Sequence, residues 1–226
     1  MNAINNIEEI NDLFYADREQ RKNYIQSARD VFDKVKTQLN VEPDRILALN
    51  RSWFSEMLIA QGKDVLVLPS ALNPDDRFDM VLATDEMLTR TDSEIEQKNI
   101  IQQLVSLLAP GGVLLVSLRD FKNTYCHRRM IGDSCFAQIN RDRYVITEVN
   151  EPSSQDKQKW SAKYHVVVND QDFSCLEVGS RRTLYFKQLA KYCSDSGVTD
   201  FGNIKDGYWR NHLRRMPEHL IYARTK

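Results

Sequence analysis

Three side chains that could bind a ligand or take part in a reaction follow the short apolar run Phe78 to Ala83: Thr84, Asp85 and Glu86. Ligands bind at the carboxyl ends of the strands in open α/β sheets, so a strand here makes Asp85 a candidate catalytic carboxylate. The same residues also suit a helix start, where a hydroxyl caps the first turn and acids complement the helix dipole. Both interpretations remain open from the sequence.

A second group follows the most apolar run of the chain, Val113 to Leu118. Arg119 stands at its end, and a guanidinium offers paired donors to a carboxylate in a fixed fork. His127 lies close by in sequence and could reach the same crevice as a base or as a substrate contact. The alternatives are an ion-paired, structural Arg119 and a His127 without a chemical role.

The histidines and cysteines do not predict a metal site. All four cysteines and all four histidines are scattered, and no CxxC, H-x-E or H-E-x-x-H spacing occurs. Free buried or surface thiols are the expectation for such cysteines.

Composition excludes several classes of protein. The chain has 226 residues and a formal net charge of -1, with 31 basic and 32 acidic side chains, which gives no global attraction to nucleic acid. Its N-terminus carries acids and amides where a signal peptide would be basic and then apolar, and no run reaches the ~18 apolar residues of a membrane span. We therefore expect a cytoplasmic protein without a membrane or nucleic-acid partner.

The elements that must position these side chains alternate in type. Apolar runs of strand length occur at 45–50, 64–68, 78–83 and 113–118, and helical spacing at 13–39, 52–60 and 95–108. The run at 64–68 is continuous, as in a strand that is covered on both faces. Such alternation predicts an α/β fold with a doubly wound, mostly parallel sheet and helices on both faces.

After residue 123 the pattern changes to period two, which is typical of antiparallel strands. We predict strands at 137–140, 144–149, 164–168 and 173–178, a last helix at 184–194, and closing strands at 198–201 and 219–223. The domain organisation expected is one domain over 1–226, with an N-terminal helical segment (1–42) and an inserted antiparallel hairpin lobe (124–180).

The segment LLAPGGVLLVSLRDFKN, Leu107 to Asn123, resembles the part of class I S-adenosylmethionine-dependent methyltransferases in which a helix ends in Pro-Gly-Gly and leads into a central strand. FDMVLATDEML resembles the preceding strand of that family, and TLYFKQLAKYCSDSGVTDFG its last helix and closing strand pair. The pieces follow in the family's order from about Arg45 to the end. SLRDFKN, an antiparallel lobe and then EHLIYARTK are similar in layout to glycine N-methyltransferases and related small-molecule N-methyltransferases.

This resemblance implies a Rossmann-like fold, S-adenosylmethionine as cofactor, and methyl transfer to a small amine or amino-acid-like substrate. In the enzymes it resembles, an Arg at the position of Arg119 binds the carboxylate of the substrate.

The loop after the first strand departs from the family pattern. The family has an acid and a Gly-x-Gly turn there, because the backbone must pass close to the cofactor. This chain has Ala48, Asn50 and Ser52, with no glycine. We expect the side chains of this loop, above all Arg51 and Trp53, to occupy the space that the glycines leave open.

A second departure concerns the acid that holds the cofactor's ribose hydroxyls at the end of the second strand. Pro69 or Ser70 stands there, and only a short loop leads to the next strand, where the family has a further helix and strand. Since a hydrogen bond to a charged group contributes roughly 1.5 to 3 kcal/mol, affinity for the cofactor could fall by several orders of magnitude. The candidate cofactor-binding residues are Ala48, Asn50, Ser52, Pro69, Ser70 and Thr84.

Two functions follow from these observations. In the first, the chain is a methyltransferase that acts on a small-molecule substrate, with Arg119, Asp85 and His127 as catalytic candidates. In the second, it is a pseudo-methyltransferase that has lost cofactor binding and acts as a binding or structural subunit, with a protein partner or a second copy of itself.

Overall fold

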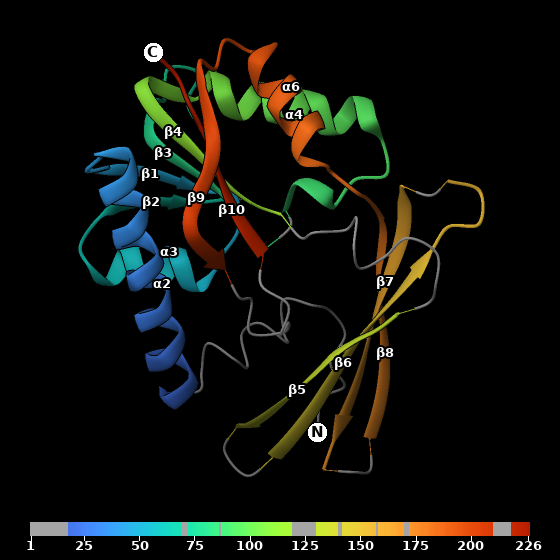
Figure 1. Cartoon of the computed structure of the whole chain (residues 1–226). Helices are drawn as coiled ribbons and strands as arrows, with labels where there is room; N and C mark the ends of the chain where they lie inside the picture. The colour runs from blue at the N-terminus through green and yellow to red at the C-terminus, as the bar shows by residue number, and fades with distance from the viewer. Residues whose placement is uncertain are drawn as a thin grey trace.

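The computed structural model describes residues 18–68, 72–85, 87–118, 130–139, 142–156, 158–169, 172–209 and 218–226. These residues form two β-sheets (Figure 1). One has six strands and is covered by helices, and the other is a separate four-stranded sheet.

The six-stranded sheet has the strand order β2-β1-β3-β4-β10-β9. Strands β1, β2, β3 and β4 pair in parallel, whereas β10 is antiparallel to both β4 and β9. Strand β9 therefore runs in the direction of β4, and β10 alone is reversed. This confirms the mostly parallel sheet. The bounds are β1 Arg45–Ala48, β2 Asp64–Val67, β3 Phe78–Ala83, β4 Leu108–Leu118, β9 Asp200–Trp209 and β10 Glu218–Arg224.

Helices cover both faces of this sheet, as predicted (Figure 1). On one face α2 (Arg18–Leu39) and α3 (Trp53–Ala60) share a buried core with the sheet, and on the other face α4 (Glu94–Ser106) and α6 (Phe186–Ser194) share a second core. A short 3-10 helix, η1 (Met87–Thr89), precedes α4. The sheet is therefore doubly wound.

Strand β2 lies at the edge of the sheet, which corrects the expectation of cover on both faces. Asp64 is exposed, and the three residues that follow it in β2 are only partly buried. Residues 68–77 alone separate β2 from β3, which leaves no length for a further helix and strand. The apolar run of β2 thus reflects partial burial at an edge.

The Pro-Gly-Gly segment has a different role from the one predicted. Helix α4 ends at Ser106, and β4 begins at Leu108, so this segment lies inside the strand. The pairing of β4 with β3 shifts register across it, which is the sign of a bulge. A Cβ atom on Gly112 would lie 2.8 Å from the backbone oxygen of Ala109, so a side chain has no space there.

The four-stranded sheet confirms the predicted antiparallel strands, at greater length. Its strands pair in sequence order, β5-β6-β7-β8, and all pairs are antiparallel. Along β7 buried and partly buried residues alternate, so one face of the sheet is the inner face. The bounds are β5 Met130–Ile139, β6 Asp142–Pro152, β7 Lys159–Val168 and β8 Asp172–Arg182.

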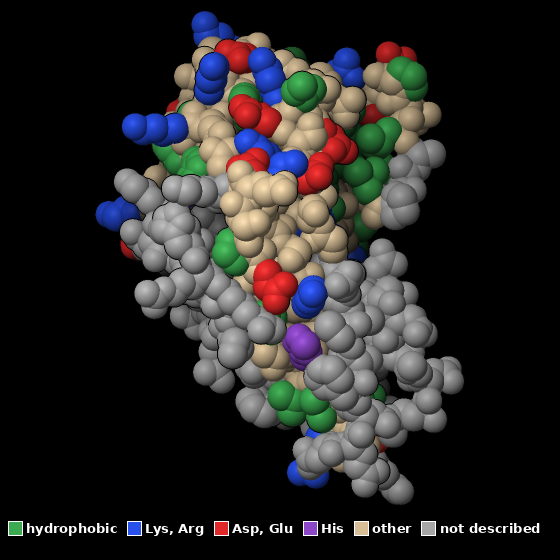
Figure 2. All heavy atoms as spheres, turned by 90° about the vertical axis from the view of Figure 1, so that its right-hand side faces the viewer, with side chains coloured by type: hydrophobic (Ala, Val, Ile, Leu, Met, Phe, Trp, Pro, Cys, Tyr) green, Lys and Arg blue, Asp and Glu red, His purple; other side chains and the backbone are tan. Residues whose placement is uncertain are grey.

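Acidic and basic side chains are intermixed over the upper part of the molecular face drawn in Figure 2. Among the described helices, none has the length and the apolar character that crossing a membrane requires.

Candidate active site at the carboxyl edge of the sheet

Several of the predicted site residues meet where β1 and β3 end. Past the last residue of β1, the Leu49 N–H still donates to the Leu82 oxygen of β3 at 3.0 Å, which keeps the two chain segments together. Asn50 Nδ2 then lies 3.2 Å from Asp85 Oδ2. Ser52 Oγ and Thr84 Oγ1 are 3.4 Å apart. We call the residues Ala48, Asn50, Ser52, Thr84 and Asp85 the carboxyl-edge cluster.

Asn50 presents an unused acceptor in this cluster. Its Nδ2 donates to Asp85 Oδ2 and to the Arg51 backbone oxygen, both at 3.2 Å. An ionised carboxylate only accepts hydrogen bonds, so the amide nitrogen must face Asp85. Asn50 Oδ1 is then left buried, and no described residue donates to it. Native proteins leave few such atoms, so this one calls for an explanation such as a ligand.

Asp85 adopts a backbone conformation that few residues other than glycine tolerate. Its φ is 59°, and it is 6% exposed. Asp is one of the residues that reach the left-handed region, and strained residues of this kind concentrate at ligand-binding and catalytic sites.

Thr84 and Asp85 do not begin an α-helix; the Thr84 oxygen accepts from the Met87 N–H, at the start of a short 3-10 helix. The 3-10 helix η1 begins shortly after them, at Met87, and the next α-helix, α4, is capped by Ser93. Thr84 is instead buried, at 1% exposure, beside Ser52. Both residues therefore belong to the carboxyl-edge cluster.

The N-terminus of α3 is closed by its own side chains. Ser52 Oγ accepts from the Ser55 N–H at 3.2 Å, and Ser55 Oγ accepts from the Ser52 N–H at 2.9 Å, a reciprocal capping box. In the family pattern this helix start faces the cofactor. Here part of its donor capacity is already used.

The bulky residues of the loop are accounted for by packing and pairing. Trp53 is 1% exposed and stacks on Tyr24 of α2, with ring centroids 5.4 Å apart. Arg51 Nε pairs with Glu56 Oε1 at 2.7 Å, on the first turn of α3. Trp53 thus belongs to the core between α2 and α3, where its large apolar surface is stabilised.

The remaining predicted site residues lie outside the described residues: Pro69, Ser70, Arg119 and His127. Within the described part of the chain, no group of three or more His, Cys, Asp or Glu side chains is placed to hold a metal ion.

The inner face of the four-stranded sheet carries polar residues that the sequence analysis missed. Glu148 and Asn150 of β6 are buried there, at 2% and 1% exposure, beside Tyr164. The available signal was the alternation in β6, where Tyr144 and Ile146 are followed at the same spacing by Glu148 and Asn150.

No family model matches the sequence, and no curated protein matches it. Solved structures of other proteins, by contrast, are similar to this chain. The S-adenosylmethionine-bound amino pentose methyltransferase CalS10 of Micromonospora echinaspora is 13% identical, with a TM-score of 0.71 over 100% of this chain and 99% of that one. DesVI of Streptomyces venezuelae is 14% identical, with a TM-score of 0.72 over 99% and 100% of the two chains.

The sugar N-methyltransferase KedS8 of a Streptoalloteichus species is 10% identical, with a TM-score of 0.62 over 100% of this chain and 95% of that one. Identities this low establish the fold alone. The particular resemblance to glycine N-methyltransferases stays a prediction. The chain shares, over its whole length, the α/β fold of these methyltransferase structures.

Proposed function

We propose that this protein transfers a methyl group from S-adenosylmethionine to the amine of a small polar acceptor. The observation that carries the proposal is the buried, unused acceptor Asn50 Oδ1 at the carboxyl ends of β1 and β3. That edge is where open α/β sheets bind their ligands. The shared fold with an amino pentose methyltransferase and a sugar N-methyltransferase supports the same assignment.

The residues of the carboxyl-edge cluster fit one part of the cofactor. The methionine end of S-adenosylmethionine carries an ammonium group, which donates hydrogen bonds and is cationic. Asn50 Oδ1 offers it an acceptor, and the Asp85 carboxylate offers a negative charge next to that acceptor. In this chain a side-chain amide and an acid would do the work that a glycine-rich backbone does in the family pattern.

When bound, S-adenosylmethionine supplies a methyl group on a positively charged sulfur, which an amine can attack in line. The protein's contribution is chiefly to position the two reactants. Asp85 holds the amide of Asn50 in one orientation. Arg119 as a contact for the acceptor and His127 as the base that takes its proton remain predictions for residues outside the described part.

Two of the similar structures are described as an amino pentose methyltransferase and a sugar N-methyltransferase. They favour an amino sugar as the acceptor over the amino-acid-like substrate expected from the sequence. The acceptor amine is the shared feature of both proposals.

Isothermal titration of the protein with S-adenosylmethionine tests the proposal. Binding with a Kd in the micromolar range is the expected result, followed by methylation of an amino-sugar panel detected by mass spectrometry. The absence of detectable binding up to millimolar concentrations of S-adenosylmethionine contradicts the proposal.

The closed N-terminus of α3 favours a second candidate, a protein of this fold that no longer binds the cofactor. In that case the helix start is a capped structural element, and the N-terminal helical segment or the four-stranded sheet serves to contact a partner protein or a second copy. The same titration separates the two candidates, because this one requires the absence of cofactor binding.

A further inference from the structure

The inner face of the four-stranded sheet changes character along β6. Tyr144 and Ile146 belong to the apolar core, whereas Glu148 and Asn150 place a carboxylate and a carboxamide at the next two inward positions. Burying such groups costs free energy unless they are hydrogen-bonded. The hydrogen-bond partners of Glu148 and Asn150 therefore indicate whether these two residues only stabilise the fold or could also bind a ligand.

The orientation of Asn150 is fixed by its neighbours. Its Nδ2 donates to Glu148 Oε1 at 3.0 Å, and the Tyr164 hydroxyl donates to Glu148 Oε2 at 3.4 Å. Because an ionised carboxylate only accepts, the amide nitrogen of Asn150 must face Glu148. Asn150 Oδ1 is left as a buried acceptor to which no described residue donates.

Aromatic side chains flank this amide on the neighbouring strand. Asn150 pairs with Ala162 of β7, and the inward positions on either side of Ala162 are Trp160 and Tyr164. Ala162 contributes only a methyl group between the two larger side chains. Arg181 of β8 lies opposite Trp160, with its guanidinium carbon 5.1 Å from the ring centroid.

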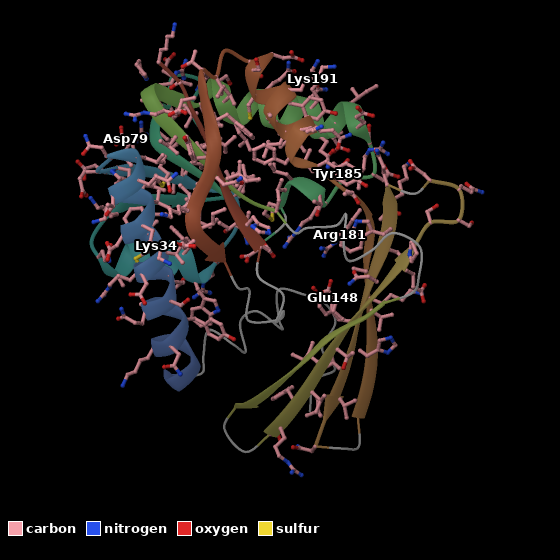
Figure 3. The ribbon with its side chains drawn as sticks, in the orientation of Figure 1. Lys34, Asp79, Glu148, Arg181, Tyr185 and Lys191 are labelled. Carbon is pink, nitrogen blue, oxygen red and sulfur yellow. The ribbon has the colours of Figure 1, made fainter. Side chains whose placement is uncertain are left out.

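These side chains are turned toward the main body of the protein. Figure 3 shows Glu148 and Arg181 on the side of the four-stranded sheet that faces the six-stranded sheet. Arg181 is 2% exposed and Trp160 is 7% exposed. The inner face that carries Asn150 is therefore turned toward the six-stranded sheet.

We infer that Asn150, with Trp160, Ala162 and Tyr164, forms the binding site for a hydroxylated amine of the amino-sugar class. A hydroxyl or amino group of the sugar donates to Asn150 Oδ1, and the apolar edges of its ring lie against the aromatic side chains. Glu148 is a positioning residue that holds the amide. The identification of this ligand as the methyl acceptor rests on the proposed function.

Saturation-transfer NMR with D-glucosamine, D-galactosamine and D-mannosamine tests the site in the full-length protein. We expect the wild type to bind at least one of the three, and Asn150→Leu to bind it about tenfold more weakly, as the loss of one buried hydrogen bond implies. Ser161→Ala, on the outer face of β7, is the matched control and should bind as the wild type does.

A second variant keeps the test decisive if Asn150→Leu does not fold. Ala162→Val leaves the Glu148–Asn150 hydrogen bond in place but adds two methyl groups between the aromatic side chains, and it should also weaken binding. Unchanged binding in a folded variant, or no binding of any of the three sugars by the wild type, overturns the inference. Titration of the same samples with S-adenosylmethionine tests the proposed function separately, since the variants should bind the cofactor as the wild type does.

Discussion

At the scale of single residues, the proposed cofactor site rests on the side-chain carboxamide of Asn50. Its nitrogen is fixed by Asp85, and its oxygen is buried without a described donor. In a glycine-rich turn the backbone itself approaches the ligand. On the proposed function, the side chain of Asn50 makes the contact that the backbone makes in such a turn, and a substitution that removes the amide tests this.

We expect Asn50→Leu to weaken the binding of S-adenosylmethionine and S-adenosylhomocysteine by roughly 10- to 100-fold, because a hydrogen bond to a charged group contributes about 1.5 to 3 kcal/mol. Methylthioadenosine lacks the amino-acid end, so its affinity should not change. Titration calorimetry measures all three ligands, and Asn99→Leu on the exposed surface of α4 serves as the control. An equal loss for methylthioadenosine would mean that Asn50 supports the fold of the site, not the ammonium group.

Cys193 provides a second test at this scale. It is fully buried on α6, and burial raises the pKa of its thiol to about 12. At pH 8 only about one thiol in 10⁴ would be ionised, and the thiolate is the reactive form. Iodoacetamide at pH 8 should therefore leave Cys193 unmodified in the folded protein and modify it after addition of denaturant, as read by peptide mass spectrometry. Modification at the same rate in both states would contradict its placement in the core.

At the scale of elements, a short polar segment positions the edge of the sheet. Asp76 lies in the connection from β2 to β3; its Oδ2 accepts from the Asn73 N–H at 2.7 Å, and its Oδ1 accepts from Arg45 Nη2 at 2.5 Å. The Asn73 N–H and then the Arg45 guanidinium hold the pKa of the Asp76 carboxyl below its ordinary value. This carboxylate thus ties the connection to the start of β1.

We expect Asp76→Asn to lower the stability of the protein at neutral pH. A carboxyl whose pKa is lowered by folding stabilises the folded state above its unfolded pKa of about 3.9, and this contribution is lost as the pH falls through the folded value. Urea unfolding at pH 7 and at pH 3 should show the difference between variant and wild type at pH 7 and a smaller difference at pH 3. A difference that does not depend on pH would mean that the charge of Asp76 has no part in it.

Most helices and strands could be predicted from the sequence because the residues that start and end them lie next to them in the chain. Helix α3 has Ser52 as its cap, and Gly62, with a φ of 77°, follows its end. The bulge at Pro-Gly-Gly was not predictable, because it depends on the pairing of β4 with β3, which lies far from it in sequence. The Asn150 site was missed for a related reason: the alternation in β6 predicts which side chains share a face, but not which face is buried or which atoms remain without a partner.

At the scale of the whole molecule, one side chain joins the four-stranded sheet to the helical layer. Arg182, at the end of β8, donates to Asp156 Oδ2 at 2.9 Å and to Gln158 Oε1 at 2.5 Å, both in the connection from β6 to β7. Its Nη2 also lies 3.5 Å from Glu94 Oε2, in the first turn of α4. Glu94 in turn accepts from the Tyr192 hydroxyl of α6 at 2.8 Å, and burial, followed by this hydrogen bond, raises the pKa of Tyr192 to about 12.

Arg182→Met tests whether this connection holds the two sheets in place. Methionine keeps much of the apolar length but removes the guanidinium, so the contacts of the Arg182 side chain with Asp156, Gln158 and Glu94 are lost while the packing is largely retained. The Lys159–Asp92 ion pair and the hydrogen bond from Gln97 to the Arg182 backbone oxygen stay in place. Hydrogen exchange measured by mass spectrometry should become faster in residues 152–159 and at the start of α4, and stay unchanged in β1 and β3. Arg143→Met, on an exposed side chain of β6, is the control and should not change exchange at either place. If exchange at 152–159 matches the wild type, the four-stranded sheet is held by its apolar contacts, and the Arg182 network does not hold it in place.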